Sequence, residues 1–378
     1  MAGIYVHIPF CARRCTYCDF FSTLSLKESG EAYVQAVIDE AALRRDELRG
    51  ETVKTLYLGG GTPSQLPIGL LQTLVHGIGK VIPLAGVEEF TIEANPDDIT
   101  PQWCDALLPL GVNRVSMGVQ SFEDRVLSVI GRRHTANQAV EAVSLLRQAG
   151  INNISIDLIY GLPGQTVASW TDSVAQAIAL KPQHISAYGL TYEPGTPLWR
   201  QRERGDVTEA TEEQYLAMYE TLVSRLKAAG YEHYEVSNFA LPGYHSRHNS
   251  SYWNETPYLG LGTAAHSFDG KVRRSNPHDL KVYIDKILSG EVACIVEEMS
   301  WQERYDERVM LALRTASGVD TDRLRQDFGD TAWQHFVSMA RPHLEAGNLS
   351  IVDGTRYALT DKGIMLSDSI IRDLFWEE

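Results

Sequence analysis

The chain has few cysteines and no long hydrophobic run. Five cysteines occur in 378 residues. This low content is typical of proteins in a reducing compartment and not of disulfide-rich secreted domains. No apolar run approaches the roughly 18 residues that a membrane-spanning helix needs. The first apolar run is not preceded by the basic segment, apolar stretch and cleavage site of a secretion signal. These absences predict a cytoplasmic location.

The chain also lacks an excess of positive charge. Its 34 Lys and Arg residues stand against 49 Asp and Glu residues, a formal net charge of −15. The long-range field of such a protein repels nucleic acid and anionic lipid. No nucleic-acid partner is therefore expected. Apolar residues at 44% and charged residues at 22% are typical of a globular protein, and the length allows two or three domains.

The chain does contain a regular alternation of apolar strands and amphipathic helices. Strands are predicted at 4–8, 53–58, 88–94, 112–119, 153–159 and 184–190. Helices are predicted at 32–48, 66–81, 101–110, 137–149, 167–180 and 212–229. Strands that alternate with helices imply a parallel sheet with right-handed crossovers, and continuous apolar strands imply burial on both faces. The predicted fold class is α/β, with an open, partial (β/α)6 TIM-like barrel over residues 1–235.

After residue 235 the pattern changes twice. Residues 236–298 are rich in aromatic residues and glycine, and we expect this segment to cover the barrel. From 299 to 378 the pattern predicts three short helices, two strands around an Asp353-Gly354 turn, and a last helix from Thr360. That order resembles a winged helix, although the acidic charge favours a protein-contact or lid role over DNA binding.

Three of the five cysteines lie directly after the first predicted strand. Cys11, Cys15 and Cys18 are separated by three residues and then by two. A structural zinc site normally has four protein ligands, whereas a 4Fe-4S cluster held by three thiolates keeps one iron open to a small molecule. Spacing alone also leaves open a zinc site completed by His7 or by a distant residue, and a disulfide. The other two cysteines are isolated and are expected to pack in the interior.

Glycine and polar residues follow the carboxyl ends of the other predicted strands. Glycines 59–61 allow the backbone to approach a ligand closely. Three strand ends carry an acid or an amide: Glu93, Gln120 and Asp157. Arg132 could pair with a carboxylate through two hydrogen bonds. Taken singly, the acids and the amide could also be ordinary caps of strand ends, and Arg132 could simply be exposed to solvent. Because parallel strands end at one edge, we expect them together, around a ligand with an amine, a carboxylate and ribose hydroxyls.

These motifs together resemble the radical S-adenosylmethionine (SAM) superfamily. The cysteine run with Tyr17 before its last cysteine, the glycine segment 59–63 and the strand-end acids carry this resemblance. Residues 7–10, 118–122 and 157–163 and the C-terminal region are similar to the oxygen-independent coproporphyrinogen III oxidase group. The resemblance therefore covers the whole chain.

The resemblance implies a set of cofactors and the residues that hold them. It implies that Cys11, Cys15 and Cys18 ligate three irons of a 4Fe-4S cluster while SAM chelates the fourth. The implied SAM-binding residues are Tyr5, Tyr17, Gly60, Gly61, Thr62, Glu93, Gln120, Arg132 and Asp157. Of these, Gly60, Gly61 and Thr62 would face the methionyl amine and Arg132 the carboxylate. Glu93 and Asp157 would bind the ribose, Gln120 would lie beside the sugar or methionyl group, and Tyr5 and Tyr17 would flank the cluster and adenine.

In active members an electron from a reducing donor passes through the cluster and cleaves SAM. Arg13 and Arg14 lie within the cysteine loop. They are either simply exposed to solvent, or they raise the potential of the cluster or dock an acidic electron donor. We assign no catalytic residue.

Two functions share this scaffold, and two departures distinguish them. The decarboxylating oxidase has a fourth cysteine two residues after the third and a long N-terminal extension. This chain has Phe20 at that position and starts ten residues before Cys11. The run 17–20 and the segment His-Asn-Ser-Ser-Tyr-Trp at 248–253 instead resemble the heme-chaperone branch of the group.

That branch implies a protein that binds heme and passes it to acceptor apoproteins; the alternative is coproporphyrinogen III dehydrogenase. His248 is the first candidate for the axial heme ligand, with Tyr252 and Trp253 against the porphyrin, and His245 and His266 are rivals. Alternatively, the segment 248–253 binds no heme, and its His-Asn pair and aromatic residues only close a packed loop. Covalent attachment has no support, because there is no Cys-x-x-Cys-His run. Acceptors at the membrane or elsewhere, SAM that is cleaved or intact, and a monomer or a homodimer are all compatible with this branch.

Overall fold

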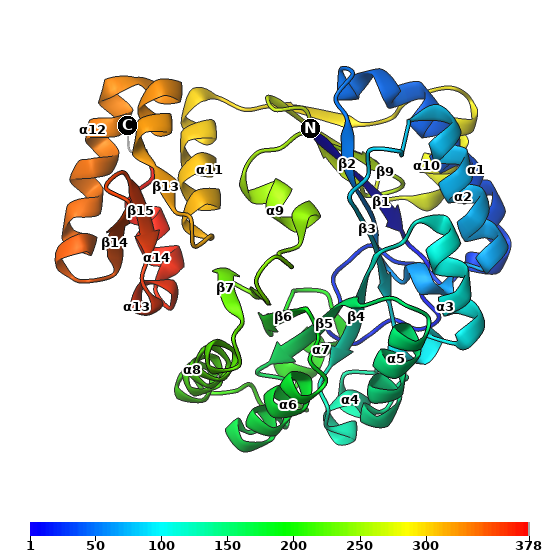
Figure 1. Ribbon diagram of the computed structural model, residues 1–378, viewed down its shortest axis with the longest axis horizontal. Coiled ribbons are helices and arrows are strands. Elements are labelled where there is room, and N and C mark those ends of the chain that lie inside the picture. The colour runs from blue at the N-terminus through cyan, green and yellow to red at the C-terminus, as the bar shows by residue number, and fades with distance from the viewer. Residues whose placement is uncertain (377–378) are drawn as a thin grey trace.

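The computed structural model describes residues 1–376 and consists of a large curved sheet wrapped by helices, with a smaller C-terminal domain beside it (Figure 1). The centre of the sheet is formed by six strands: β1 (Ala2–Ile8), β2 (Val53–Gly60), β3 (Glu89–Ala94), β4 (Arg114–Gln120), β5 (Asn153–Tyr160) and β6 (His184–Gly189). They lie side by side in chain order, and each pairs in parallel with the next. The predicted partial (β/α)6 barrel is confirmed.

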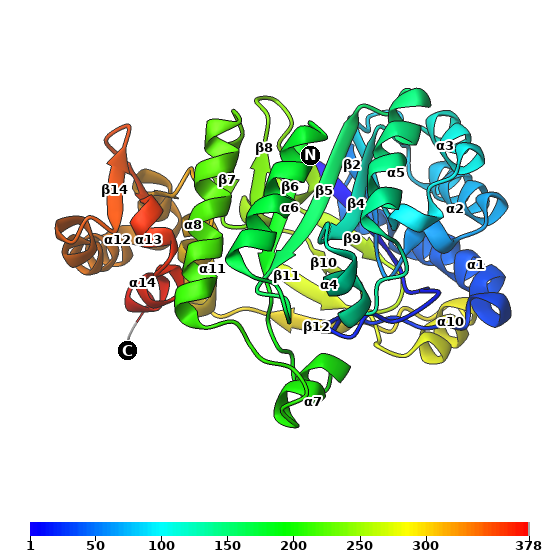
Figure 2. The same ribbon diagram turned by 90° about the horizontal axis from the view of Figure 1, so that it is seen from below.

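Helices between the strands cover the outer face of the sheet (Figure 2). The helices that the sequence predicted are α1 (Leu26–Arg44), α2 (Ile68–Val81), α3 (Pro101–Leu107), α5 (Ala136–Gln148), α6 (Val167–Ala179) and α8 (Glu212–Ala228). Every second strand residue packs against them; Ile4, Val6 and Ile8 of β1, for example, are fully buried in the main hydrophobic core. The sequence did not predict α4 (Asp124–Val129) or α7 (Pro197–Glu203). None of the helices described here is long and apolar enough to cross a membrane.

Strands from later in the chain cover both edges of the six-stranded centre. On one side β9 (Tyr258–Leu261) pairs in parallel with β1, and β10 (His266–Phe268), β11 (Val272–Ser275) and β12 (Ile295–Glu298) follow in antiparallel order. On the other side β8 (Asn238–Ala240) pairs with β6, and β7 (Glu232–Glu235) pairs with β8. The edges of the six-stranded centre are therefore paired, and β12 and β7 form the edges of the whole sheet. The segment 236–298, which we expected to cover the barrel, thus also adds strands to the sheet.

Two helices of that later segment lie on opposite faces of the sheet. α10 (Leu280–Leu288) packs against α1 on the outer face. α9 (Arg247–Trp253) lies against β2 on the inner face, between the sheet and the C-terminal domain (Figure 1). Ser246 caps α9 by accepting from the amide of Asn249, which satisfies one of the free amides of its first turn.

The C-terminal domain has the predicted winged-helix-like order and its own core. Its elements are α11 (Trp301–Leu313), β13 (Val319–Asp320), α12 (Thr321–Glu345), β14 (Leu349–Val352), β15 (Arg356–Leu359), α13 (Asp361–Ile364) and α14 (Ser367–Asp373). α12 comprises two helices that meet at Gly329, whose φ of 88° is outside the helical region. Tyr305, Phe336 and Ile370 belong to a hydrophobic core separate from that of the barrel.

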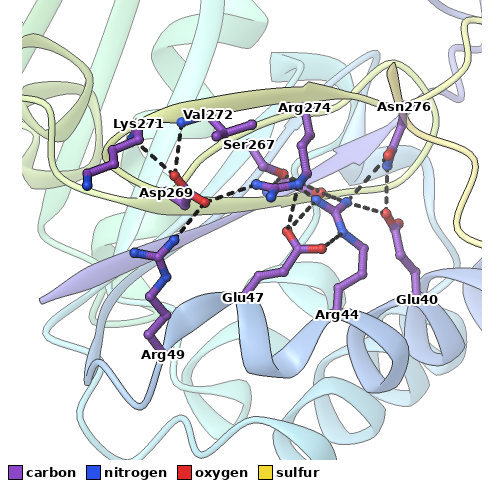
Figure 3. Close-up of polar contacts among 11 residues, drawn as sticks. Glu40, Arg44, Glu47, Arg49, Ser267, Asp269, Lys271, Val272, Arg274 and Asn276 are labelled. Atoms are coloured by element: carbon purple, nitrogen blue, oxygen red, sulfur yellow. Dashed lines mark hydrogen bonds and ion pairs between the residues drawn. The ribbon is translucent and has the colours of Figure 1, made fainter. Parts of the chain in front are cut away.

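A buried ion pair ties the added strands to the barrel (Figure 3). Arg44, in α1, donates to Glu40 Oε1 at 2.6 Å, and the two side chains are 1% and 0% exposed. Arg44 also donates to the carbonyl of Gly260 in β9 at 3.0 Å and to Ser267 Oγ in β10 at 2.9 Å. Glu40 accepts from the amide of Gly262 at 2.8 Å. Because both charges are paired and hydrogen-bonded to this segment, they hold β9 and β10 against α1.

Removing one partner of this pair is expected to destabilise the protein strongly. Arg44→Met leaves the Glu40 charge buried and unpaired, and we expect the free energy of unfolding to fall by about 3–5 kcal/mol. Urea denaturation followed by circular dichroism measures the loss. Arg49→Met is the matched control, because Arg49 pairs with Asp269 in the same region but is 64% exposed. The control should lose at most about 1 kcal/mol, and equal losses in the two variants would contradict the assignment.

Candidate functional site at the strand ends

The cysteine loop leaves β1 and closes on itself at its base. The amide of Cys11 donates to the carbonyl of Thr23 at 2.9 Å, and the amide of Thr23 donates to the carbonyl of Pro9 at 2.7 Å. Cys11, Cys15 and Cys18 are free and partly exposed. The loop therefore presents its thiols from a base anchored at the carboxyl end of β1.

The two helices that the sequence did not predict hold the middle of this loop. The amide of Thr16 donates to the carbonyl of Ile130, directly after α4, at 3.1 Å. The carbonyl of Thr16 accepts from the amide of Leu198 in α7 at 2.8 Å. Tyr17 packs against a small apolar group made by α4 and the end of β5: Val126, Leu127, Ile130, Ile159 and Leu162. These contacts position the loop between α4 and α7.

Hydrogen-bond donors from the loops after β2 and α4 reach two of the thiols. Thr62 Oγ1 donates to Cys11 Sγ at 3.4 Å, and Arg132 Nη1 lies 3.5 Å from Cys15 Sγ. Burial raises the pKa of the Cys18 thiol to about 11 and also raises the pKa of the Cys11 thiol. Burial thus favours the protonated thiols, and thiolates would form on coordination to a metal. Three thiols with adjacent donors fit the ligand set of a three-cysteine 4Fe-4S cluster.

The structure does not support His7 as a fourth ligand. Its Nε2 is hydrogen-bonded to the carbonyl of Phe21 at 3.0 Å, and its Nδ1 to the hydroxyl of Tyr5 at 3.1 Å. Both ring nitrogens are therefore engaged. Within residues 1–376, no three His, Cys, Asp or Glu side chains have the arrangement that would hold a single metal ion.

The glycine segment after β2 is needed for close approach of two backbones. Gly60 has a φ of +107°, and a Cβ there would lie 2.5 Å from the ring of His7. A Cβ on Gly61 would lie 2.8 Å from the carbonyl oxygen of Ile8, the atom that accepts from the Gly61 amide at 2.8 Å. Only glycine allows these positions without strain, and the result is that Thr62 lies beside the cysteine loop.

Two carboxyl groups face the interior of the barrel below this rim. Glu93 accepts from the Tyr57 hydroxyl at 2.8 Å and from the Gly60 amide at 3.0 Å. Burial, with the charge of Asp157 adding to it, raises the pKa of Glu93 to about 7 despite these hydrogen bonds. Asp157 accepts from Ser116 Oγ at 3.2 Å, and burial raises its pKa as well. Buried carboxyls with perturbed pKa values are typical of ligand sites.

Arg132 connects three elements of the rim. Its Nη2 donates to Asn95 Oδ1 at 2.6 Å and to the carbonyl of Gly118 in β4. Its buried Nε has no partner among the described residues. Gln120 lies beside it, at a register shift in β4 and with a φ of +68°. An arginine with a free, buried donor next to the thiols fits the carboxylate of SAM.

The inner face of the barrel is polar through its whole depth. Since alternate residues of a strand point to opposite faces, the inward-facing set is Tyr5, His7, Thr55, Tyr57, Glu89, Thr91, Glu93, Arg114, Ser116, Ser155, Asp157, His184 and Ser186. Closed parallel barrels are filled mainly by branched apolar side chains instead. Arg114 is 1% exposed, yet its Nε and Nη1 have no partner among the described residues. This lumen is suited to ligands and water rather than to apolar packing.

Helix α9 closes the lumen where the strands begin, and His248 is its central contact. His248 is 0% exposed. Its Nδ1 is hydrogen-bonded to Thr55 Oγ1 at 2.8 Å and its Nε2 to the Tyr252 hydroxyl at 3.0 Å. Glu89 accepts from the amide of His248 at 2.9 Å. Burial lowers the pKa of His248 to about 3. With both nitrogens engaged inside the protein, His248 does not present a lone pair to a heme in this structure.

The other histidine candidates lie on the surface, in two different places. His245 is 43% exposed, lies 2.8 Å from Glu232 and stacks on Tyr234. It shares a cleft with Trp253. His266 is exposed on β10, near the edge of the sheet that β12 completes. The structure therefore brings together His245 and Trp253 and separates both from His266.

The buried position of Glu93 predicts a pH effect on stability. Its pKa of about 7 in the folded protein exceeds the roughly 4.3 of an unfolded glutamate. The stability gained from the protonated carboxyl is therefore fully present below about pH 4 and is lost as the pH rises through about 7. We expect Glu93→Gln to become more stable relative to the unsubstituted protein between about pH 5 and pH 8, as measured by urea denaturation.

Glu88→Gln is the control for this experiment. Glu88 is exposed and its pKa is lowered by hydrogen bonding to Lys54. The stability difference between Glu88→Gln and the unsubstituted protein should stay flat over the same pH range. A flat difference for Glu93→Gln as well would contradict the elevated pKa.

Two family models match the chain. That of the radical SAM superfamily matches residues 5–177, and that of the HemN C-terminal domain matches residues 299–366. Among solved structures, coproporphyrinogen III oxidase (HemN) from Escherichia coli matches with a TM-score of 0.85 at 24% sequence identity. The match covers 99% of this chain and 90% of the oxidase chain. At that identity the similarity shows the fold.

Curated relatives are more similar in sequence. The heme chaperone HemW of Lactococcus lactis is 35% identical, covering 99% of this chain and 97% of its own. That of Bacillus subtilis is also 35% identical, covering 98% of each chain. HemW of Escherichia coli is 37% identical over 72% of each chain. The chain therefore belongs to the radical SAM superfamily and, within the group related to oxygen-independent coproporphyrinogen III oxidase, to the HemW family.

Proposed function

We propose that the protein is a heme chaperone, which binds heme and transfers it to acceptor apoproteins. The observation that carries this proposal is the near full-length similarity, at 35% identity, to proteins named heme chaperone HemW. The oxidase is similar in fold, but one fold supports several functions. Phe20, at the position where the oxidase has its fourth cysteine, is 63% exposed to solvent. The proposed location is the cytoplasm, where thiols are kept reduced.

We further propose that the strand-end site holds a 4Fe-4S cluster and SAM. Cys11, Cys15 and Cys18 would ligate the cluster, and Arg132 would take the SAM carboxylate through its free Nε. Glu93, Asp157 and Gln120 would bind the ribose and methionyl groups, with Tyr5, Tyr17, Gly60, Gly61 and Thr62 completing the site. When bound and supplied by an electron donor, this pair of cofactors provides one-electron reductive chemistry. The chain's own contribution is to anchor the cysteine loop and to orient the ligand.

One pair of assays distinguishes the heme-chaperone function from the oxidase function. After anaerobic reconstitution of its iron, the protein is incubated with heme and separately with coproporphyrinogen III. We expect stoichiometric heme uptake, seen as a protein-bound Soret band, and transfer of that heme to an apoprotein acceptor. Coproporphyrinogen III should remain unchanged by chromatography. Conversion to protoporphyrinogen IX would contradict the chaperone function and support the oxidase.

The ligand set of the cluster can be tested separately from heme binding. Cys15→Ser is expected to remove most of the iron and the visible absorbance shoulder of the reconstituted protein. The reason is that the two remaining thiolates are too few ligands to hold the cluster. Cys104→Ser is the control, since Cys104 is 1% exposed within α3, away from the loop. An unchanged iron content in Cys15→Ser would refute the proposed ligands.

A further inference from the structure

The cysteine loop carries two arginines whose surroundings differ. Arg13 and Arg14 are both exposed and lie between the first two cysteines of the motif. The Nε of Arg14 donates to the hydroxyl oxygen of Ser22 at 3.0 Å, across the loop. Arg13 forms no side-chain hydrogen bond or ion pair within residues 1–376. The structure therefore fixes one of these two cations in the loop and leaves the other to solvent.

Ser22 connects Arg14 to the first thiol of the motif. Ser22 is 8% exposed, and its hydroxyl is hydrogen-bonded to the Cys11 side chain. Because the Ser22 oxygen accepts from Arg14, its proton is available to the sulfur. The amide of Cys11 also donates to the carbonyl of Thr23 at 2.9 Å, which holds the two arms of the loop together. The guanidinium charge is thereby anchored beside one of the proposed cluster ligands.

A second guanidinium group lies beside the second thiol. Arg132 Nη1 is 3.5 Å from Cys15 Sγ. Arg132 Nη2 donates to Asn95 Oδ1 at 2.6 Å, which fixes the orientation of the group. Arg132 is also less exposed than Arg14. Two of the three thiols therefore have an anchored positive charge close to them.

These charges bear on the redox chemistry of the cluster that the site is proposed to hold. A 4Fe-4S cluster with three thiolate ligands is negatively charged, and reduction by one electron adds a further negative charge. Nearby cations and hydrogen bonds to the sulfurs stabilise the reduced form more than the oxidised form, which raises the reduction potential. Asp19 is the one acidic residue between positions 9 and 23, and it is exposed. Two anchored guanidinium groups against one exposed carboxylate leave a positive balance at the thiols.

We propose that Arg14, acting through Ser22 at Cys11, and Arg132, at Cys15, raise the reduction potential of the cluster. The inference rests on the proposed 4Fe-4S cluster at the strand-end site. The redox step is the transfer of one electron from a low-potential flavin or iron–sulfur donor to the oxidised cluster, in which no bond breaks and no proton moves. A cluster with a higher potential accepts this electron more readily and drives the reductive cleavage of SAM less strongly.

The role of Arg14 is tested by redox titration of the full-length protein after anaerobic reconstitution, without SAM. The protein is reduced stepwise with dithionite in the presence of redox mediators, and the reduced cluster is measured by electron paramagnetic resonance. Arg14→Gln is expected to lower the equilibrium constant for one-electron reduction about three- to tenfold, which is a midpoint potential about 30–60 mV lower. Arg14→Lys keeps the charge and should recover most of that shift.

Arg13→Gln is the matched control for Arg14→Gln. It removes the same charge from the neighbouring position but breaks no contact with Ser22. Because the Arg13 charge is screened by solvent, the equilibrium constant for reduction should change by less than about twofold. Equal midpoint potentials in Arg14→Gln and the unsubstituted protein, or the same shift in Arg13→Gln, would overturn the role of Arg14.

Arg132→Gln is measured in the same way, because the absence of SAM separates the effect on the cluster from any effect on ligand binding. Arg132 is less exposed and lies directly at a sulfur, so the shift should be about tenfold, or about 59 mV. Arg133→Gln is its control, since Arg133 pairs with Asp97 and Asp98 instead of a thiol. An unshifted potential in Arg132→Gln would overturn the role of Arg132.

Ser22→Ala removes the link to Cys11 and leaves both arginines in place, and it should lower the potential in the same direction as Arg14→Gln. Iron content and visible absorbance establish that each variant holds the cluster. If the unsubstituted protein assembles no cluster, the proposed strand-end site fails and this inference fails with it. If the cluster forms and all variants have the same potential, only this inference fails.

Discussion

The structure depends on a barrel that does not close. Six parallel strands curve into a partial barrel and leave two sheet edges and one inner face to be covered. Later strands solve the first problem: β9 pairs with β1, and β8 with β6. The buried pair of Arg44 and Glu40 is part of this solution, because its hydrogen bonds reach the backbone of β9. The edges of the sheet thereby move from β1 and β6 out to β12 and β7.

The open inner face explains the polar lumen and the helix within it. A closed barrel excludes water by filling its centre with branched side chains, whereas this one is lined by hydroxyl, imidazole and charged groups. Glu93 and Asp157 are buried there at an energetic cost that a bound ligand can offset. Helix α9 limits access where the strands begin, through the contacts of His248. The segment 248–253 thus has a sealing part, His248 and Tyr252, and a part that faces the interdomain cleft, Trp253.

Much of the fold was predictable because its signals are local. The six central strands agree with the predicted ones to within a few residues, since buried parallel strands are continuous apolar runs. Helices α4 and α7 were missed because they are six and seven residues long, too short for a periodic signal. Helix α3 is no longer than these, but a 3-10 turn at Leu108–Leu110 continues it, so that ten residues carry the pattern. Thr196 before Pro197, a cap followed by proline at the first helical position, could have revealed α7. The edge strands were missed because three or four residues carry little pattern.

The sequence by itself determined the spacing of the three thiols, the glycines at 59–61 and the polar strand ends. These follow from chain order alone, because parallel strands bring their carboxyl ends to one rim. Only the tertiary structure decided which histidine is accessible. His248 and His245 lie three residues apart, yet one is sealed in the lumen and the other faces the cleft. That difference arises from contacts with Thr55, Glu89 and the C-terminal domain, all distant in the chain, and burial set by distant contacts is not encoded in a local motif.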